Sequence, residues 1–269
     1  MSVQFRNVNS KKTPYFSLIT VVKNGEKNIA RCIESVNSQT FKDFEYIIID
    51  GNSTDSTTNI IGQNSDFIDH FVSEDDKGLY YAMNKGLSFA SGNYIGILNS
   101  DDMYDLHALE NIYEITRSRP GASIIYGAIK YLDDQCKNHF ISDVELNTKM
   151  IYHPAVFVKR SVYLEIGGFN TKYQIAADYD FILRCKRNKE VFFGTETTIA
   201  LFSKGGYSSK HKIRSVLETS LIQYIYSDNN IFLSFANLMI GLVKALRLYS
   251  CIRDLFKKFF KLFQNNIQD

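Results

Sequence analysis

The sequence predicts an α/β fold, in which a mostly parallel central sheet carries helices on both faces and a helical extension follows. Three observations support this. Short apolar runs alternate with segments of helical periodicity over the first hundred residues. Two of those runs stop abruptly at acidic residues. From His211 onward the pattern is almost wholly helical. The 269 residues suffice for one α/β domain, predicted over 1–212, and an extension over 213–269.

The first half of the domain, about 15–104, alternates between strands and helices. The predicted strands are Phe16–Val22, Phe44–Asp50, Phe67–Ser73 and Tyr94–Leu98, and the predicted helices are Glu26–Ser38, one capped by Ser53 or Thr54, and Leu79–Ala90. The helix from Glu26 has one apolar face by the i, i+3, i+4, i+7 rule. Strands alternating with helices are typical of a parallel sheet with both faces covered.

The second half, about 105–212, mixes β and α patterns and is expected to form an acceptor pocket. The expected elements are a helix over Leu106–Arg117, strands over Ser123–Leu132 and His139–Leu146 around a turn at Asp133–Gln135, a strand over Tyr152–Lys159, a helix over Asp178–Arg187, and short strands over Val191–Phe193 and Thr198–Phe202. Pro154 interrupts one of these strands and marks it as an edge or bulged piece.

Composition argues against several classes of protein. A net charge of +2 gives no support for a nucleic-acid partner. The four cysteines are scattered without a CxxC pair, which favours a reducing cytosol over a zinc site or a disulfide framework. The first 15 residues are polar, so no signal peptide is expected. No run reaches the roughly 20 apolar residues of a spanning helix.

Basic charge is concentrated near the C-terminus. Between Lys244 and Lys261 there are six basic residues and one acidic residue. Apolar residues recur at helical spacing over Ile231–Phe263 with lysines and arginines between them, as in helices that lie on an anionic membrane surface. The alternative is a helix that packs on the core or on a partner subunit. The first interpretation predicts a cytoplasmic protein, peripheral on the inner membrane.

The most informative turn follows the fourth strand. The apolar run Tyr94–Leu98 ends at Asn99-Ser100-Asp101-Asp102. Carboxylates at the end of a buried strand are costly unless a cation meets them, and ligands bind at this edge of open α/β sheets. We expect Asp102, with Asp101, to hold a divalent metal that in turn holds a diphosphate. The alternative is a solvated turn in which Asp102 or Asp105 caps the next helix.

Eight stretches together resemble one family, over roughly residues 15–210. They are Ser17–Gly25, Ser35–Thr40, Phe44–Thr54, Asp76–Gly86, Gly92–Asp102, His153–Val158, Ile166–Phe169 and Ala176–Phe181. Any one is weak, but in this order they resemble the family 2 glycosyltransferases of GT-A fold, and most closely the branch of bacterial surface-polysaccharide assembly.

The resemblance implies a donor site with Mn²⁺ or Mg²⁺ as cofactor. Asp102 matches the family's metal ligand, and Asp101 its donor-side neighbour. Asp50 matches the acid that recognises the nucleotide base, although Gly51 stands where many relatives carry a second acid. The remaining donor-side candidates are Thr20, Lys23, Asn24 and Lys77. Lys23 replaces a common stacking aromatic residue, and Lys77 is equally compatible with a solvated lysine.

The resemblance also implies an acceptor side. Asp178 matches the family's catalytic base, which removes the proton of the attacking hydroxyl; an N-cap role is the alternative. Asp180 is the second candidate for the base, but two residues along a helix it points about 200° away. His153 is expected near the diphosphate or the acceptor, or else as a satisfied buried histidine. His211 is a candidate for an extra metal ligand.

The leading hypothesis is an inverting glycosyltransferase that moves a sugar, expected to come from a UDP-sugar, to a glycan or lipid-linked acceptor at an anionic membrane. A homo-oligomer is compatible with this hypothesis. The alternative is a catalytically silent subunit that binds sugar nucleotides and anchors an assembly complex. A dinucleotide-binding Rossmann enzyme is disfavoured because no GxGxxG follows the first strand. A nucleotidyltransferase is disfavoured because no lysine-containing glycine-rich loop follows Val22.

Overall fold

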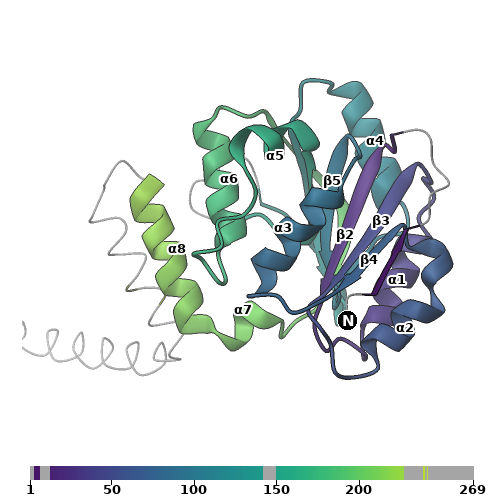
Figure 1. Ribbon diagram of the computed structural model, residues 1–269. Coiled ribbons are helices and arrows are strands. Elements are labelled where there is room, and N and C mark those ends of the chain that lie inside the picture. The colour runs from purple at the N-terminus through teal and green to yellow at the C-terminus, as the bar shows by residue number, and fades with distance from the viewer. Residues whose placement is uncertain (1–2, 7–12, 142–149, 227–238, 240, 242–269) are drawn as a thin grey trace, which may run out of the picture. The chain divides into compact units, whose positions relative to one another are not determined.

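The computed structural model describes residues 3–6, 13–141, 150–226, 239 and 241 (Figure 1). Two compact units divide the chain, Met1–Gly206 and Tyr207–Asp269. The described helices of the second unit are α7 (Tyr207–Lys210) and α8 (Lys212–Tyr226). Most of the predicted basic amphipathic segment at 231–263 lies outside the described residues. Among the residues that the structure describes, no helix has the length and apolarity needed to cross a membrane.

The first unit is organised around one mixed, mostly parallel sheet in the order β1-β4-β3-β2-β5-β9-β7-β10-β6, with β8 paired to β7. The strands are β1 (Val3–Arg6), β2 (Phe16–Val22), β3 (Phe44–Asp50), β4 (His70–Ser73), β5 (Tyr94–Asn99), β6 (Met103–Tyr104), β7 (Ile124–Tyr131), β8 (Asp134–His139), β9 (Val156–Lys159) and β10 (Phe192–Phe202). Neighbours β4, β3, β2 and β5 run parallel, whereas β9 is antiparallel to both β5 and β7.

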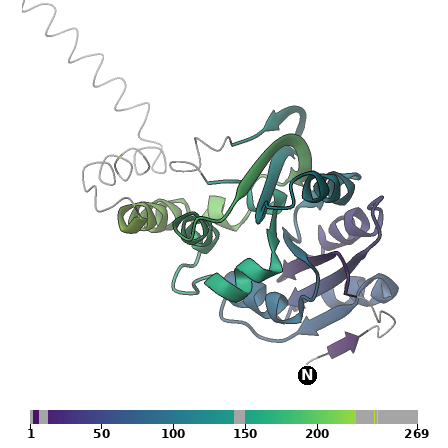
Figure 2. The same cartoon turned by 90° about the horizontal axis from the view of Figure 1, so that it is seen from above.

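Two helical layers cover the sheet (Figures 1 and 2). One core lies against α1 (Ile29–Asn37), α2 (Thr57–Gln63) and α4 (Ala108–Ser118). The other lies against α3 (Leu79–Phe89), α5 (Arg160–Ile166) and α6 (Ala177–Arg187). Side chains of β2 alternate between the two, with Leu18 in the first core and Ile19 in the second. The α/β fold class expected from the sequence is therefore confirmed.

The first half follows the sequence pattern closely. β2 and β3 have the predicted bounds, and β5 runs one residue further, to Asn99. The third strand is shorter than predicted: it begins at His70, after a 3-10 turn at Ser65–Phe67. Phe67 is 49% exposed, so it does not belong to the buried strand. The second helix begins at Thr57 with Ser56 as its N-cap residue, rather than with Ser53 or Thr54.

The second half departs from the predictions at three places. The turn predicted at Asp133–Gln135 lies partly within β8, a polar strand without apolar alternation, and 142–149 lie outside the described residues. The predicted strand Tyr152–Lys159 is a 3-10 turn, His153–Ala155, followed by β9, as expected where a proline removes a ladder donor. The two short strands after Val191 are one strand, β10, with register shifts between Gly194 and Ala200.

Four short elements were not expected from the sequence: β1, β6, α5 and α7. β1 (Val3–Arg6) pairs antiparallel with β4 at the edge of the sheet. α5 (Arg160–Ile166) has only seven residues, too few to show helical periodicity.

Candidate active site

Four parallel strands end together at one edge of the sheet. Val22 at the end of β2 aligns with Asp50 on β3, which aligns with Ser73 on β4. On the other side of β2, Val21 aligns with Asn99 on β5. Ligands bind at the carboxyl ends of strands in open α/β sheets. The topology therefore brings the loops after Val22, Asp50, Ser73 and Asn99 to one site.

Two segments of the second half reach the same edge. β9 is antiparallel to β5, so the 3-10 turn before β9, which contains His153, lies beside the end of β5. The residue after β10, Ser203, donates its backbone N–H to Asp102 Oδ1 at 2.8 Å. Segments from both halves of the first unit thus meet along this edge.

Asp50 is fully buried at the end of β3 and is held by two serines. Its Oδ2 accepts the Ser73 hydroxyl at 2.6 Å and the Ser53 N–H at 3.0 Å, and its Oδ1 accepts the Ser53 hydroxyl. Such hydrogen bonds compensate the cost of burying a carboxylate. Asp50 is therefore a buried carboxylate held in place by hydrogen bonds, not a solvated turn residue.

Asn24 joins two of the strand-end loops. Its backbone N–H donates to the Ser53 hydroxyl at 2.7 Å, and its side-chain oxygen accepts the Thr54 N–H at 2.9 Å. Asn24 has a φ of 52°, in the left-handed region where asparagine is tolerated. The side chain thus fixes the loop after β2 against the loop after β3, which is a structural role beside the donor contact predicted from the sequence.

Lys23 and Lys77 are both exposed at this edge. A Cβ built on Gly51 would lie 3.4 Å from Lys23 Cδ and 2.7 Å from Asp76 Oδ2, so the absence of a side chain at Gly51 makes room for both. Asp76 also accepts the Gly78 N–H at 2.9 Å, which shapes the turn that carries Lys77. The two lysines are placed where they can approach an anion.

Thr20 lies inside β2, two residues before its end, and is fully buried. Its hydroxyl accepts a hydrogen bond from Tyr46 at 3.0 Å and lies 3.7 Å from Cys32 Sγ. Thr20 therefore faces the core between β2 and α1, and its predicted donor contact stays a prediction.

Asp102 is only 1% exposed, directly after β5. One oxygen, Oδ1, accepts the Ser203 N–H, but Oδ2 is buried and has no hydrogen-bond partner among the described residues. Burial, together with the charge of Asp101, raises the pKa of Asp102 to about 8. A buried carboxylate oxygen without a hydrogen-bond partner needs another partner, and a bound cation would be one.

Asp101 is half-buried beside Asp102, and Arg31 of α1 contacts the same turn. The Arg31 guanidinium donates to the Asp101 backbone carbonyl at 2.9 Å, and its charge lowers the pKa of Asp102. Carboxylate oxygens are the ligands that Mg²⁺ and Mn²⁺ prefer. The donor set at Asp101 and Asp102 fits such an ion, although no cluster of three or more acidic, histidine or cysteine side chains occurs among the described residues.

Asp178 is the second residue of α6, after the N-cap residue Ala176. Its Oδ1 accepts the Tyr80 hydroxyl at 2.9 Å and the Tyr179 N–H at 2.9 Å. The carboxylate is half-buried and lies in the first turn of a helix, where the macrodipole favours negative charge. Its position within the helix differs from the N-cap position that was the alternative for it.

Asp180 points elsewhere and is already paired. It is 3% exposed, and its Oδ2 accepts the Arg184 Nε–H at 2.9 Å. The same guanidinium donates to the backbone carbonyls of Ile166 and Gly168. Asp180 therefore orders the loop before α6, which leaves Asp178 as the stronger candidate for a base.

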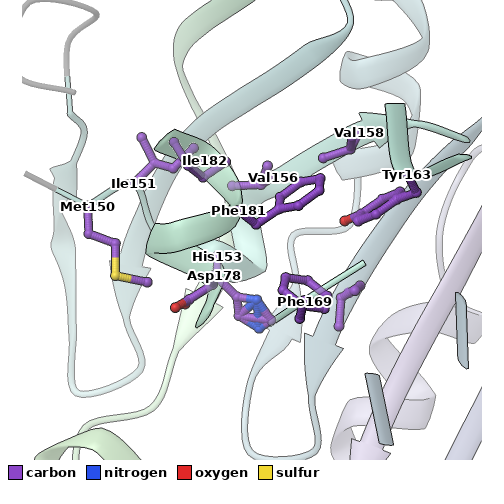
Figure 3. A pocket seen from close by; sticks show the side chains of 11 residues that line it. Met150, Ile151, His153, Val156, Val158, Tyr163, Phe169, Asp178, Phe181 and Ile182 are labelled. Atoms are coloured by element: carbon purple, nitrogen blue, oxygen red, sulfur yellow. The ribbon is translucent and has the colours of Figure 1, made fainter. Parts of the chain in front are cut away.

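His153 and Asp178 line one pocket (Figure 3). The pocket has about 370 Å³ of empty space, counting its open mouth, and its other lining residues are aliphatic, aromatic or methionine. Burial lowers the pKa of His153 to about 4, so the ring is neutral near pH 7. Its Nε2 is buried and has no partner among the described residues. The pocket thus combines an apolar wall with an unused ring nitrogen and a carboxylate.

His211 belongs to the second unit and is exposed, between α7 and α8. Its place relative to the strand ends is not part of the described arrangement, so its role as an extra metal ligand stays a prediction.

Four contributors to the site were not expected from the sequence: Ser73, Ser203, Arg31 and Tyr80. Ser73, Ser203 and Arg31 each contact the site through a hydrogen bond to a residue distant in the sequence, so no local sequence pattern identifies them. Tyr80 is different, because Tyr80, Met83 and Gly86 are buried at helical spacing on α3. That spacing could have identified Tyr80 as an inward-facing residue.

Several known proteins are similar to this chain in sequence or in fold. A "PGL/p-HBAD biosynthesis glycosyltransferase" of Mycobacterium bovis (strain BCG / Pasteur 1173P2) is 32% identical over 181 residues, which cover 65% of this chain and 71% of that protein. The mannosyltransferase PcManGT from Pyrobaculum calidifontis, solved with GDP-Man and Mn²⁺, has a TM-score of 0.67 at 16% identity and covers 91% of this chain and 81% of that one.

A third similar structure is S. aureus TarS 1-349 in complex with UDP-GlcNAc, with a TM-score of 0.62 at 16% identity. The match covers 77% of this chain and 66% of the TarS chain, slightly under two thirds of it. At these identities the two structures support the fold alone. The family model "Glycosyl transferase family 2" matches residues 17–169, more than half of the sequence. The chain belongs to glycosyl transferase family 2.

Proposed function

We propose that this glycosyltransferase is a metal-dependent inverting enzyme that moves a sugar from a nucleotide-diphosphate sugar, a UDP-sugar, to a hydroxyl of a glycan or lipid-linked acceptor in bacterial surface-polysaccharide biosynthesis. The observation that carries the proposal is the buried Oδ2 of Asp102 at the carboxyl edge of the sheet, which has no hydrogen-bond partner in the described part of the chain. The match to family 2 supports transfer from a nucleotide sugar as the class of reaction.

Residues of the first half bind the donor. Asp50 presents an ordered carboxylate that can accept a hydrogen bond from an N–H of the base. Lys23 and Lys77 face the anionic diphosphate from exposed positions. Asp102, with Asp101, would hold Mn²⁺ or Mg²⁺, and the bound ion would supply positive charge to neutralise the leaving diphosphate. The relative PcManGT was solved with GDP-Man and Mn²⁺.

Residues of the second half handle the acceptor. The acceptor hydroxyl oxygen forms a bond to the anomeric carbon while the bond from that carbon to the diphosphate oxygen breaks. Asp178 accepts the hydroxyl proton, a contribution typically of about 10²–10⁴-fold in rate. One displacement from the side opposite the diphosphate inverts the anomeric configuration. His153, neutral and with a buried Nε2, is available to hydrogen-bond the acceptor in the pocket beside Asp178.

Asp178→Asn tests the proposal against the alternative of a silent binding subunit. Donor turnover is measured for UDP-glucose, UDP-N-acetylglucosamine and GDP-mannose with and without Mn²⁺, and nucleotide binding is measured by calorimetry. We expect the wild type to turn over a UDP-sugar only with Mn²⁺, and Asp178→Asn to lose turnover while it binds UDP normally. Asp66→Asn, at an exposed acid in the 3-10 turn before β4, is the matched control. Wild-type inactivity with every donor would favour the silent subunit.

A membrane contact through the basic C-terminal segment is part of the same proposal. The charge pattern between Lys244 and Lys261 supports it, since each basic residue near an anionic surface contributes about 1 kcal/mol. These residues lie outside the described part of the chain.

A further inference from the structure

Tyr80 contacts Asp178 from the other half of the site. It is the second residue of α3 and is 4% exposed, whereas its neighbour Tyr81 is 40% exposed. The Tyr80 hydroxyl lies 2.9 Å from Asp178 Oδ1 and 2.7 Å from the Ile175 backbone carbonyl oxygen. Ile175 lies just before α6 and Asp178 lies in its first turn, so one phenol bridges α3 and the base.

The Tyr80 hydroxyl has one proton for these two acceptors. A charged carboxylate accepts a stronger hydrogen bond than a neutral carbonyl. The proton is therefore directed to Asp178 while Asp178 is ionised. Burial and the charge of Asp178 raise the pKa of Tyr80 well above its usual value, so the phenol stays protonated and acts only as a donor.

The surroundings hold Tyr80 in this position. Asn84, one turn further along α3, pairs with the backbone of Phe169 in both directions, with its amide donating at 2.8 Å and its oxygen accepting at 2.8 Å. The Phe169 ring packs against the Tyr80 ring with their centroids 5.5 Å apart. Arg184 holds the loop just before Phe169 to α6. These contacts hold the Tyr80 hydroxyl in its position beside Asp178.

We propose that Tyr80 is a positioning residue for Asp178: its hydroxyl fixes the orientation of the carboxylate and favours the charged form that accepts the acceptor proton. This inference rests on the proposed role of Asp178 as the base. During transfer the proton moves from the acceptor hydroxyl to Asp178, and Tyr80 keeps its own proton. Once Asp178 is neutral, the Ile175 carbonyl offers the Tyr80 hydroxyl its second acceptor.

Tyr80→Phe tests the proposal, because it removes one oxygen and keeps the ring that packs on Phe169. Tyr81→Phe on the exposed neighbour is the matched control. Turnover of the most active nucleotide sugar of the donor panel is measured with Mn²⁺, water serving as the acceptor. We expect kcat to fall about 10- to 100-fold in Tyr80→Phe, because the Asp178 carboxylate is no longer held in its orientation toward the acceptor hydroxyl. The KM for the donor and the affinity for UDP should change less than about twofold, a split that a general structural defect would not give.

A second measurement uses the Asp178→Asn background. If Tyr80 acts through Asp178, adding Tyr80→Phe to Asp178→Asn leaves the residual rate unchanged. An unchanged kcat in Tyr80→Phe, with Asp178→Asn inactive, overturns the positioning role and leaves the proposed function intact. A parallel loss of kcat and UDP affinity overturns it as well, because it shows a defect of the whole site. Full activity in Asp178→Asn overturns the base and the positioning role together. Binding of UDP by each variant, with its melting curve, verifies folding.

Discussion

Asp102→Asn should stabilise the metal-free protein at alkaline pH while it removes metal-dependent activity. The native pKa of Asp102 is about 8 against an ordinary value of 3.8. The native state therefore binds this proton more tightly than the unfolded chain, and the stability of the wild type falls as the pH rises through that window. Each unit of difference between the native and unfolded pKa corresponds to about 1.4 kcal/mol. The free energy of unfolding of the wild type is therefore lowered by at most about 6 kcal/mol above pH 8. Asparagine has no charge to bury.

The assay is urea unfolding of both proteins in EDTA between pH 5 and pH 9. The free energy of unfolding of Asp102→Asn relative to the wild type should increase with pH up to about pH 8 and then level off. Comparing slopes removes any constant difference between the two side chains. Addition of Mn²⁺ should raise the midpoint of the wild type more than that of the variant, because binding to the native state stabilises it. Identical pH dependence in the two proteins would refute the argument that burial of an uncompensated charge distinguishes Asp102.

Three further predictions concern other parts of the chain. Arg184→Met should destabilise the protein by about 3–5 kcal/mol, because it removes the guanidinium that pairs with the buried Asp180 carboxylate and binds two backbone carbonyls; chemical denaturation measures this, and a cost below 1 kcal/mol would contradict it. Gly92→Ala should cost about 1–3 kcal/mol, since its Cβ would lie 2.6 Å from backbone atoms of Phe16 and Ser17, while Gly121→Ala, with open space, serves as the control in the same thermal melts. Deleting residues 244–269 should reduce co-sedimentation with anionic vesicles, and undiminished binding would argue against a surface helix.

The donor half was predictable because each signal was local. Buried parallel strands appear as continuous apolar runs, so β2 and β3 were predicted with their observed bounds. Asp50 and Asp102 were visible as acids that end such runs. An apolar run that is buried on both faces does not show which face each of its residues takes, so the core-facing position of Thr20 inside β2 was not predictable.

The acceptor half was harder to predict because its order depends on contacts distant in sequence. The polar stretch at 195–197 interrupts the apolar pattern of β10, yet the strand continues through register shifts against β7. His153 lies in a 3-10 turn that becomes part of the site only because β9 runs antiparallel to β5. Ser203 meets Asp102 across 101 positions of chain, and no short-range pattern encodes such a contact.

The contacts that α3 makes through Tyr80 and Asn84 have a consequence for recombining members of this family. A chimera that exchanges the acceptor half alone would place a foreign segment 166–178 against a helix selected for another partner. The two halves are then not freely exchangeable, because α3, in the first half, contacts Asp178 and Phe169 of the second half. A crossover placed before residue 79 takes α3 and the second half from the same protein. It therefore keeps the Tyr80–Asp178 and Asn84–Phe169 contacts intact and is the more promising design.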